Sequence, residues 1–319
     1  MQYVTAHPDG VLAIDAGYGR DGLAAIHLVI HRGRAAIIDA GTPASVPRVF
    51  SALAAAGIAP ENVDWVMLTH IHLDHAAGAG PLMAALPQAR LLVHPRGVRH
   101  LADPQRLWSA NAEVYGSQRL VEMYGEPVPV PAERIVAAEE GLRVALGERS
   151  FRVLDTPGHT RHHIAIWDET AHAGFVGDTF GVSYRELDRD GHAFVFPSTM
   201  PSEFEPDALH RSIDRIASLR PEAIYLGHYS RVTGVDRIAT DLHRLIDAQV
   251  AIACAARGHG VKRHVEILAG LEQLVCEEVE RQGAPVSEEE VLELLRMDLD
   301  MNAQGLGMWM DKHPEAVTA

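Results

Sequence analysis

Three histidines and an aspartate occur within six residues of this sequence, as His70-Ile-His72-Leu-Asp74-His75. Imidazole nitrogens and carboxylate oxygens are ligands of zinc, manganese and iron at hydrolytic sites. Histidines at i and i+2 can face one ion where the backbone turns, whereas the helical zinc motif spaces its two histidines four apart. The alternative is a group of surface histidines, because the chain contains 19 of them. The density of ligand types favours the first half of a metal site.

Three further potential ligands each follow a short apolar run, as the histidine cluster also does. Runs of this length with β-branched and aromatic members are typical of buried strands. The runs are residues 64–68 before the cluster, 151–155 before His159, 173–177 before Asp178, and 223–226 before His228. Four predicted strands therefore each end in a potential ligand.

The elements around these runs alternate between strand and helix patterns. Residues 11–16, 24–31 and 34–40 predict a meander of three strands separated by glycine-containing turns. Thr42 followed by Pro43 predicts the start of a helix that extends to Gly57. Further along, a short helix at residues 82–86 and a strand at 90–94 continue the pattern. This β/α alternation indicates an α/β fold.

Residues 95–130 interrupt the alternation with a mostly helical pattern that ends in a proline-rich stretch. We predict an inserted helical segment here. Its aromatic residues Trp108, Tyr115 and Tyr124 either pack locally or line a pocket.

The pattern from about residue 240 is purely helical. Apolar stripes predict two helices that end near Gly258 and Gly283, and Ser287 with Glu290 predicts a capping box for a third. We therefore expect a domain of residues 1–239 and a helical C-terminal extension of residues 240–319 packed on it. The extension either packs in the core or forms a homodimer contact, or it covers the metal site and selects the substrate.

The order and contexts of these residues resemble the metallo-β-lactamase superfamily, whose signature is an H-x-H-x-D-H run followed by a later His, Asp and His. The match covers roughly residues 10–235 and is similar to the glyoxalase II, lactonase and tRNase Z side of the family. The resemblance implies a four-layer αβ/βα sandwich with a two-metal site at one edge of its paired sheets. It implies that one ion is held by His70, His72 and His159, the other by Asp74, His75 and His228, with Asp178 bridging both.

The resemblance also implies hydrolysis at two divalent metal ions. Zinc is the metal we expect, with manganese or iron as alternatives. Two ions about 3.5–4 Å apart bind a water between them, lower its pKa toward neutrality and polarise a carbonyl or phosphoryl oxygen. Asp74 would orient that water and carry a proton to the leaving group. Asp39 is either a partner of a ligand imidazole or a turn cap. Lactonases of this superfamily carry a Tyr shortly after the bridging Asp; Tyr184, next to Ser183, is the candidate here, although its spacing is longer.

We expect the substrate to be a small carboxylic ester, lactone or thioester. The basic pattern that binds glutathione in glyoxalase II is not found near the C-terminus, which disfavours a glutathione thioester. One alternative is a phosphodiesterase acting on a small phosphodiester. Another is a non-catalytic sensor or an iron-dependent oxygenase, although such proteins usually alter or lose ligands of the second ion.

The remaining histidines are predicted to be surface or hydrogen-bonded side chains. His163 is intermediate, because the family often carries a histidine at this place that need not touch metal. The others are His94, His100, His172, His192, His210, His243, His259, His264 and His313.

Composition restricts the partners and the compartment. The chain of 319 residues has 28 basic and 43 acidic residues, a net charge of −15 and no basic run, which disfavours nucleic acid. No apolar run is long enough to span a bilayer, and the start lacks the pattern of a secretory signal. The two cysteines, Cys254 and Cys276, lie in predicted helices, which disfavours disulfides. We therefore expect a cytoplasmic protein with a small-molecule substrate and no membrane partner.

Overall fold

The computed structural model of the chain describes residues 1–284 and 286–314, without the side chains of residues 110, 111 and 113–115. Contacts within the chain divide it into two units. The first consists of Met1–Asp155, His162–Gly177 and Ala223–Arg231, and the second of Thr156–Arg161, Asp178–Glu222 and Val232–Ala319.

The first unit contains a seven-stranded sheet whose strands follow the order of the chain. They are β1 (Val4–His7), β2 (Val11–Asp15), β3 (Ala25–His31), β4 (Arg34–Ile38), β5 (Val63–Met67), β6 (Arg90–Val93) and β7 (Ile135–Ala137). Pairing is antiparallel from β1 to β4 and parallel from β4 to β7. The change occurs where hairpins give way to the longer crossovers that parallel strands require. These crossovers contain α1 (Val46–Ala55), α2 (Leu73–Ala76) and α3 (Ala79–Ala85).

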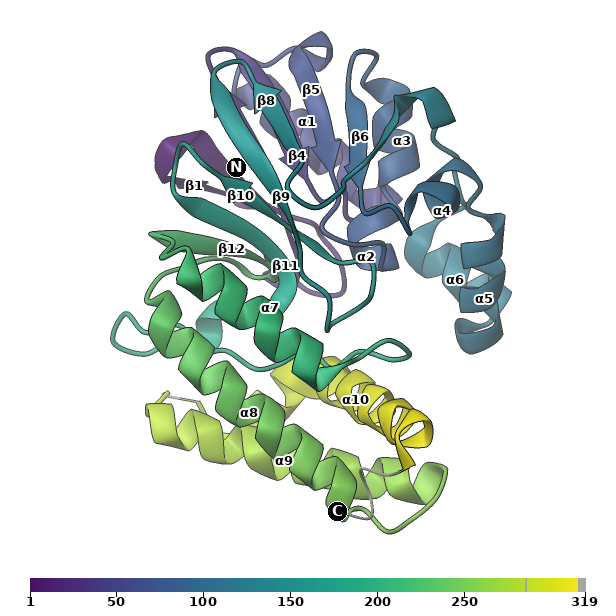
Figure 1. Cartoon of the computed structure of the whole chain (residues 1–319), viewed down its shortest axis with the longest axis vertical. Helices are drawn as coiled ribbons and strands as arrows, with labels where there is room; N and C mark the ends of the chain where they lie inside the picture. Colours follow the sequence, from purple (N-terminus) through teal and green to yellow (C-terminus); the bar gives the residue numbers. More distant parts are fainter. Residues whose placement is uncertain (285, 315–319) are drawn as a thin grey trace. The chain divides into compact units, whose positions relative to one another are not determined.

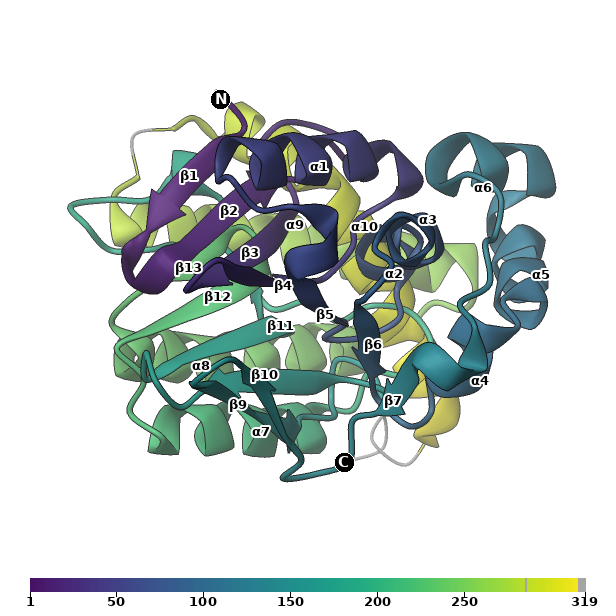
Figure 2. The same cartoon turned by 90° about the horizontal axis from the view of Figure 1, so that it is seen from above.

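A second sheet has the order β13-β12-β11-β10-β9-β8. Its strands are β8 (Arg143–Leu146), β9 (Arg149–Asp155), β10 (Ile164–Asp168), β11 (Ala173–Val182), β12 (Ala223–His228) and β13 (Ser230–Val232), of which β11 and β13 continue into the second unit. Within the first unit, Figure 2 shows the two sheets as adjacent layers, with α1, α2 and α3 on the outer side of the first. Apolar side chains of both sheets, such as Ile38 and Met67 with Phe151 and Phe175, form one buried core.

An inserted segment connects β6 to β7 in the first unit (Figure 1). It contains α4 (Val98–Ala102), α5 (Gln105–Tyr115) and α6 (Ser117–Tyr124). Trp108 and Tyr124 belong to a local apolar cluster with Leu73 and Leu120, and the Tyr124 hydroxyl lies 2.7 Å from that of Tyr18. The two aromatic side chains therefore pack locally, whereas the side chain of Tyr115 lies outside the described residues.

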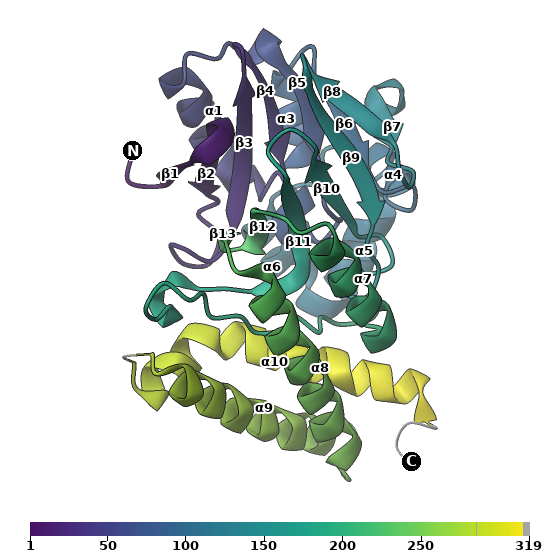
Figure 3. The ribbon, with the colours of Figure 1, turned by 60° about the vertical axis from the view of Figure 1, so that its left-hand side comes forward.

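The second unit is dominated by four helices: α7 (Pro206–Ser218), α8 (Val235–Ala255), α9 (Val261–Gln282) and α10 (Glu288–Lys312). The last three pack on one another pairwise (Figure 3). Gly283 ends α9 in the left-handed conformation, and Ser287 with Glu290 forms the predicted capping box of α10. Among the described residues, no helix is long and apolar enough to cross a membrane.

Short 3-10 helices complete the chain, at Pro8–Gly10, Pro43–Ser45, Pro60–Asn62, Ala132–Arg134 and Arg185–Leu187. Two boundaries differ from the sequence prediction by five residues. The helix expected from about residue 240 begins at Val235, and the strand expected to end at Gly177 continues to Val182.

Candidate metal centre

The histidine cluster follows β5 and enters a short helix. Residues 68–72 have no regular structure, and His72 is an extended N-cap with φ −62° and ψ 148°. Asp74 and His75 then lie within α2. Because the backbone turns between His72 and Asp74, the cluster can present side chains in more than one direction. The expected position directly after a strand is confirmed.

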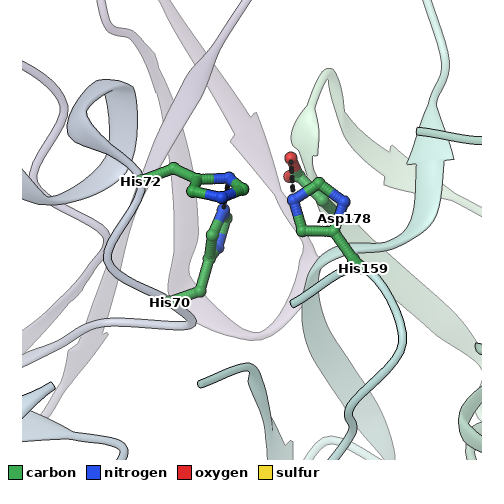
Figure 4. Close-up of side chains that lie close together, drawn as sticks. All are labelled: His70, His72, His159 and Asp178. Atoms are coloured by element: carbon green, nitrogen blue, oxygen red, sulfur yellow. Dashed lines mark hydrogen bonds and ion pairs between the residues drawn. The ribbon is translucent and has the colours of Figure 1, made fainter. Parts of the chain in front are cut away.

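His70 and His72 form the first pair of imidazoles, both from the first unit. Nε2 of His70 lies 3.1 Å from Nδ1 of His72, and their rings meet nearly edge to face (Figure 4). The other ring nitrogen of His70 lies 3.1 Å from the Thr69 hydroxyl. His70 is fully buried and His72 is half-buried.

His75, His228 and Asp74 form a second group in the first unit. Nε2 of His75 lies 3.2 Å from Nε2 of His228, and one carboxylate oxygen of Asp74 lies 3.5 Å from the former and 3.4 Å from the latter. Each of the three offers a ligand atom within 4.8 Å of the others. His228 is the last residue of β12, which brings it beside residues about 150 positions earlier in the chain.

Hydrogen bonds on the far side of each ring determine where its proton lies. Nδ1 of His75 donates to Asp39 at 3.0 Å, and Nδ1 of His228 donates to the Leu23 carbonyl at 2.9 Å. A neutral imidazole has a single N–H, so both Nε2 atoms carry lone pairs directed toward the same small region. Two lone pairs and a carboxylate oxygen repel one another unless a cation lies among them. These donors therefore fit a divalent metal ion.

Asp39 is the partner of a ligand imidazole, the first of the two interpretations above. Besides His75, its carboxylate accepts hydrogen bonds from the backbone N–H and the hydroxyl of Thr69. Thr69 in turn contacts His70. The buried carboxylate of Asp39 thus orients His75 of the second group and contacts Thr69, the residue next to His70 of the first pair.

The pKa of Asp74 lies well below its usual range. Burial opposes ionisation, but the neighbouring His75, His228 and His72 together outweigh it. Asp74 is therefore a carboxylate, which accepts hydrogen bonds or binds a cation.

The second unit contains the other two predicted ligands, His159 and Asp178. Nε2 of His159 lies 3.5 Å from a carboxylate oxygen of Asp178, and both side chains are buried (Figure 4). Nδ1 of His159 donates to the Ser198 carbonyl at 3.1 Å, so its Nε2 is again the nitrogen with a lone pair.

A residue of α10 supports the carbonyl that orients His159. Asn302 accepts a hydrogen bond from the N–H of Thr199 and donates to the carbonyl of Pro197, on either side of Ser198, each at 2.8 Å. Sequence reasoning missed Asn302. The available signal was an amide at a buried position of an apolar helical stripe, where an unpaired polar group is costly.

Asp178 lies inside β11 and not after its end, which corrects the sequence prediction. Gly177 precedes it with φ +47°, and a Cβ at this position would lie 2.5 Å from Nε2 of His163 and 2.7 Å from the Thr69 hydroxyl. A glycine accommodates this conformation and these close contacts, and strand structure continues past it to Val182.

The other predicted candidates lie as follows. Tyr184 is buried, and its hydroxyl lies 3.0 Å from both carboxylate oxygens of Asp298 on α10, while Ser183 donates to the Phe194 carbonyl. His163 is buried with its ring 5.0 Å from that of His70. The ring of His162, which sequence reasoning missed, lies 5.7 Å from that of His72. The run of two histidines after Arg161 was the available signal.

The family model described as the metallo-beta-lactamase superfamily matches residues 7–228, more than half of the chain. The chain belongs to the metallo-β-lactamase superfamily. Its predicted α/β sandwich fold with a helical extension is confirmed, and so is its predicted class, a metal-dependent hydrolase, at the level of this family. Membership together with the His/Asp group indicates that the chain binds divalent metal.

Solved structures of the superfamily share the fold. A family protein from Thermus thermophilus has a TM-score of 0.65 at 19% identity, covering 96% of this chain and 94% of that one. An archaeal superfamily protein from Sulfolobus tokodaii has a TM-score of 0.60 at 22% identity, covering 86% and 100%.

Several curated relatives carry the name hydroxyacylglutathione hydrolase. The relative from Acidiphilium cryptum is 32% identical over 202 residues, which are 63% of this chain and 62% of that protein. The relative from Fuscovulum blasticum is 30% identical over 210 residues, which are 66% and 63%. The match thus spans less than two thirds of either hydrolase.

Proposed function

We propose that this chain is a dinuclear metallohydrolase that cleaves a small carboxylic ester, lactone or thioester. The observation that carries the proposal is the convergence of the lone pairs of His75 and His228 on one oxygen of Asp74. The names of the two hydroxyacylglutathione hydrolases support a thioester within this substrate class.

We propose the full ligand set that the family resemblance implies. His70, His72 and His159 would hold one ion and Asp74, His75 and His228 the other, with Asp178 shared. The support for this set is the match of its seven residues, in type and order, to the signature of the family to which the chain belongs.

Zinc is the metal we propose, with manganese and iron as alternatives, because all three accept imidazole and carboxylate ligands. Bound ions would polarise the substrate carbonyl and lower the pKa of a water molecule toward neutrality. Asp74 directs one oxygen toward the two imidazoles. Its other oxygen is then available to accept a hydrogen bond from the attacking water, to orient it and to pass its proton to the leaving group.

The acidic balance of the chain supports a small-molecule substrate rather than nucleic acid. Cys254 and Cys276 are free thiols, which supports a reducing compartment such as the cytoplasm.

The test combines metal analysis with a substrate panel. The purified full chain is assayed against aryl esters, lactones, acylated thiols including S-acylglutathiones, and a small phosphodiester. We expect bound divalent metal and turnover of one of the first three classes. In His72→Ala we expect metal content and rate to fall, the rate by at least about 100-fold, since even residues that only orient a ligand are worth 10–100-fold.

His192→Ala is the matched control, because His192 is an exposed histidine in the second unit. Phosphodiester turnover without ester turnover would replace the proposal by a phosphodiesterase. Iron as the sole metal, with oxygen uptake and no hydrolysis, would replace it by an oxygenase.

A further inference from the structure

A second cluster of histidines and aspartates lies in the second unit, on two helices that carry none of the ligands proposed above. His210 and Asp214 are on α7, and His243 and Asp247 are on α8. Each pair belongs to the same pentapeptide, His-Arg-x-Ile-Asp, at residues 210–214 and 243–247. A spacing of four places both polar side chains of a pair on one face of the helix.

The two pentapeptides contact each other reciprocally. Nε2 of His210 donates to Asp247 at 3.1 Å, and Nε2 of His243 donates to Asp214 at 2.9 Å. The two rings stack, with centroids 4.8 Å apart and planes inclined by 20°. Their remaining nitrogens, the two Nδ1 atoms, lie 2.5 Å apart.

These contacts leave negative potential between the rings. A carboxylate only accepts hydrogen bonds, so each Nε2 carries the ring's N–H and each neutral ring has its lone pair on Nδ1. The separation of 2.5 Å is shorter than a normal hydrogen bond between nitrogens. A cation between the Nδ1 atoms relieves the repulsion. Because the two carboxylates contribute two negative charges, a divalent ion neutralises the cluster, whereas one shared proton does not.

We propose that His210 and His243 bind a divalent transition-metal ion through their Nδ1 atoms, with Asp214 and Asp247 orienting the rings. Imidazole suits zinc, copper and nickel, and a carboxylate on the second nitrogen is the common arrangement for metal-binding histidines. The two histidine side chains are 23% and 29% exposed, so an ion enters from solvent and water completes its coordination. Tetrahedral binding at about 2.0–2.1 Å requires the two nitrogens to separate to about 3.3 Å, which partly exposed rings can do.

The ion would fasten α7 to α8, and α7 supports the loop that carries His159. The Ser212 hydroxyl donates to the Pro157 carbonyl at 2.6 Å, and the N–H of Glu205, which precedes α7, donates to the Gly158 carbonyl at 2.8 Å. Gly158 also lies so close to Leu209, the neighbour of His210, that a Cβ there would be 2.3 Å from its backbone. The site is therefore structural.

The test uses the full chain, first loaded with zinc and then titrated with Cu²⁺, which binds nitrogen ligands most tightly of the common divalent ions. We expect an electron paramagnetic resonance signal of one Cu²⁺ coupled to two nitrogens, while elemental analysis shows that no more than one zinc ion per chain is displaced. His210→Ala and His243→Ala should each abolish the two-nitrogen signal. Asp214→Asn, which preserves shape, should weaken Cu²⁺ binding about 10–100-fold.

His259→Ala is the control, because His259 is exposed between α8 and α9 and should leave the signal unchanged. Should either alanine variant fail to fold, Asp214→Asn and Asp247→Asn decide the matter alone. The proposal is overturned if zinc-loaded protein gives no two-nitrogen signal, or if the signal and its affinity persist in these variants. A proton shared by the two rings would be the explanation in the first case.

Discussion

Asp39 contacts both imidazole groups of the first unit, His75 directly and His70 through Thr69. In Asp39→Asn one accepting oxygen becomes an NH₂ group, which cannot satisfy both the Thr69 N–H and Nδ1–H of His75. We expect divalent metal affinity to fall about 10–100-fold, as for other residues that orient a ligand. The backbone should be retained, because Asp39 has φ +59° and asparagine tolerates this conformation.

Competition with a chromophoric chelator measures this affinity. Asp21→Asn, at an exposed carboxylate, is the control. Equal affinities in the two variants would show that Asp39 does not act on the metal.

His27 on β3 makes stability depend on pH. Burial, with a smaller effect of the charge of His7, lowers the pKa of His27 to about 3 from its ordinary 6.5. Between these values the unfolded chain binds a proton that the folded chain does not, so the free energy of unfolding falls as pH is lowered through this range. The slope for one proton is about 1.4 kcal/mol per pH unit at most. His27→Phe should reduce the slope of the free energy of unfolding against pH by up to this amount.

Urea unfolding of chelator-treated protein between pH 7 and 5 measures the effect, since the ligand histidines then contribute equally to both proteins. His259→Phe, at an exposed position, should keep the wild-type slope. Identical slopes in all three proteins would mean that His27 is protonated in the folded state.

At the scale of residues, clusters of ligand types that are close in sequence were predictable. Roles that depend on contacts between distant residues were not. His70 to His75 form a cluster that few other functions explain. Thr69 gives no such signal and Asn302 only a weak one, an amide in an apolar stripe, because their partners lie elsewhere in the chain and become neighbours only on folding. The reciprocal bonds of His210 and His243 were missed for the same reason.

Gly305 lets α10 approach the segment that orients His159. A Cβ at Gly305 would lie 1.7 Å from the Thr199 carbonyl oxygen and 2.7 Å from the Met200 carbonyl carbon. Gly305→Ala should therefore lower the free energy of unfolding by about 1–3 kcal/mol through overpacking. It should also weaken metal binding if the support of Ser198 is displaced.

Gly307 provides a control in the same helix, where the added Cβ would meet only the Arg263 side chain, at 3.9 Å. Gly307→Ala should stabilise by about 0.5–1 kcal/mol, because alanine is the better helix former. Thermal and urea unfolding distinguish the two. Changes of the same sign would contradict the proposed close approach.

At the scale of elements, the long periodic helices and several apolar strands were predictable, whereas other short strands were not. The Ser287–Glu290 cap and the glycine after α9 gave helix ends close to those observed. The short strands β1, β7, β8, β10 and β13 were missed, because three to five residues carry little periodicity and their pairing depends on distant partners.

At the scale of the whole molecule, we propose that the N-terminal part of α9 takes part in self-association. Val261 and Val265, one helical turn apart, are 81% and 57% exposed. We expect a homodimer, seen by light scattering as twice the mass of the chain, because a contact between two copies would remove both apolar side chains from water. Val261→Lys with Val265→Lys should give a monomer, whereas Val121→Lys on α6 should not. A wild-type monomer at tens of micromolar would refute the expectation.

The way the inserted segment joins the sheet has a consequence for how this protein can evolve. The inserted segment begins after Val93, the end of β6, and ends at Ile135, the start of β7. These two strands are parallel neighbours that pair Leu91 with Ile135. Neighbouring strands lie about 4.8 Å apart and need only a crossover of a dozen residues, so most of the insertion is free to lengthen, shorten or be exchanged without moving either strand. The strand geometry therefore permits α4 to α6 to change in length, provided that Leu73, beside His72, keeps an apolar partner.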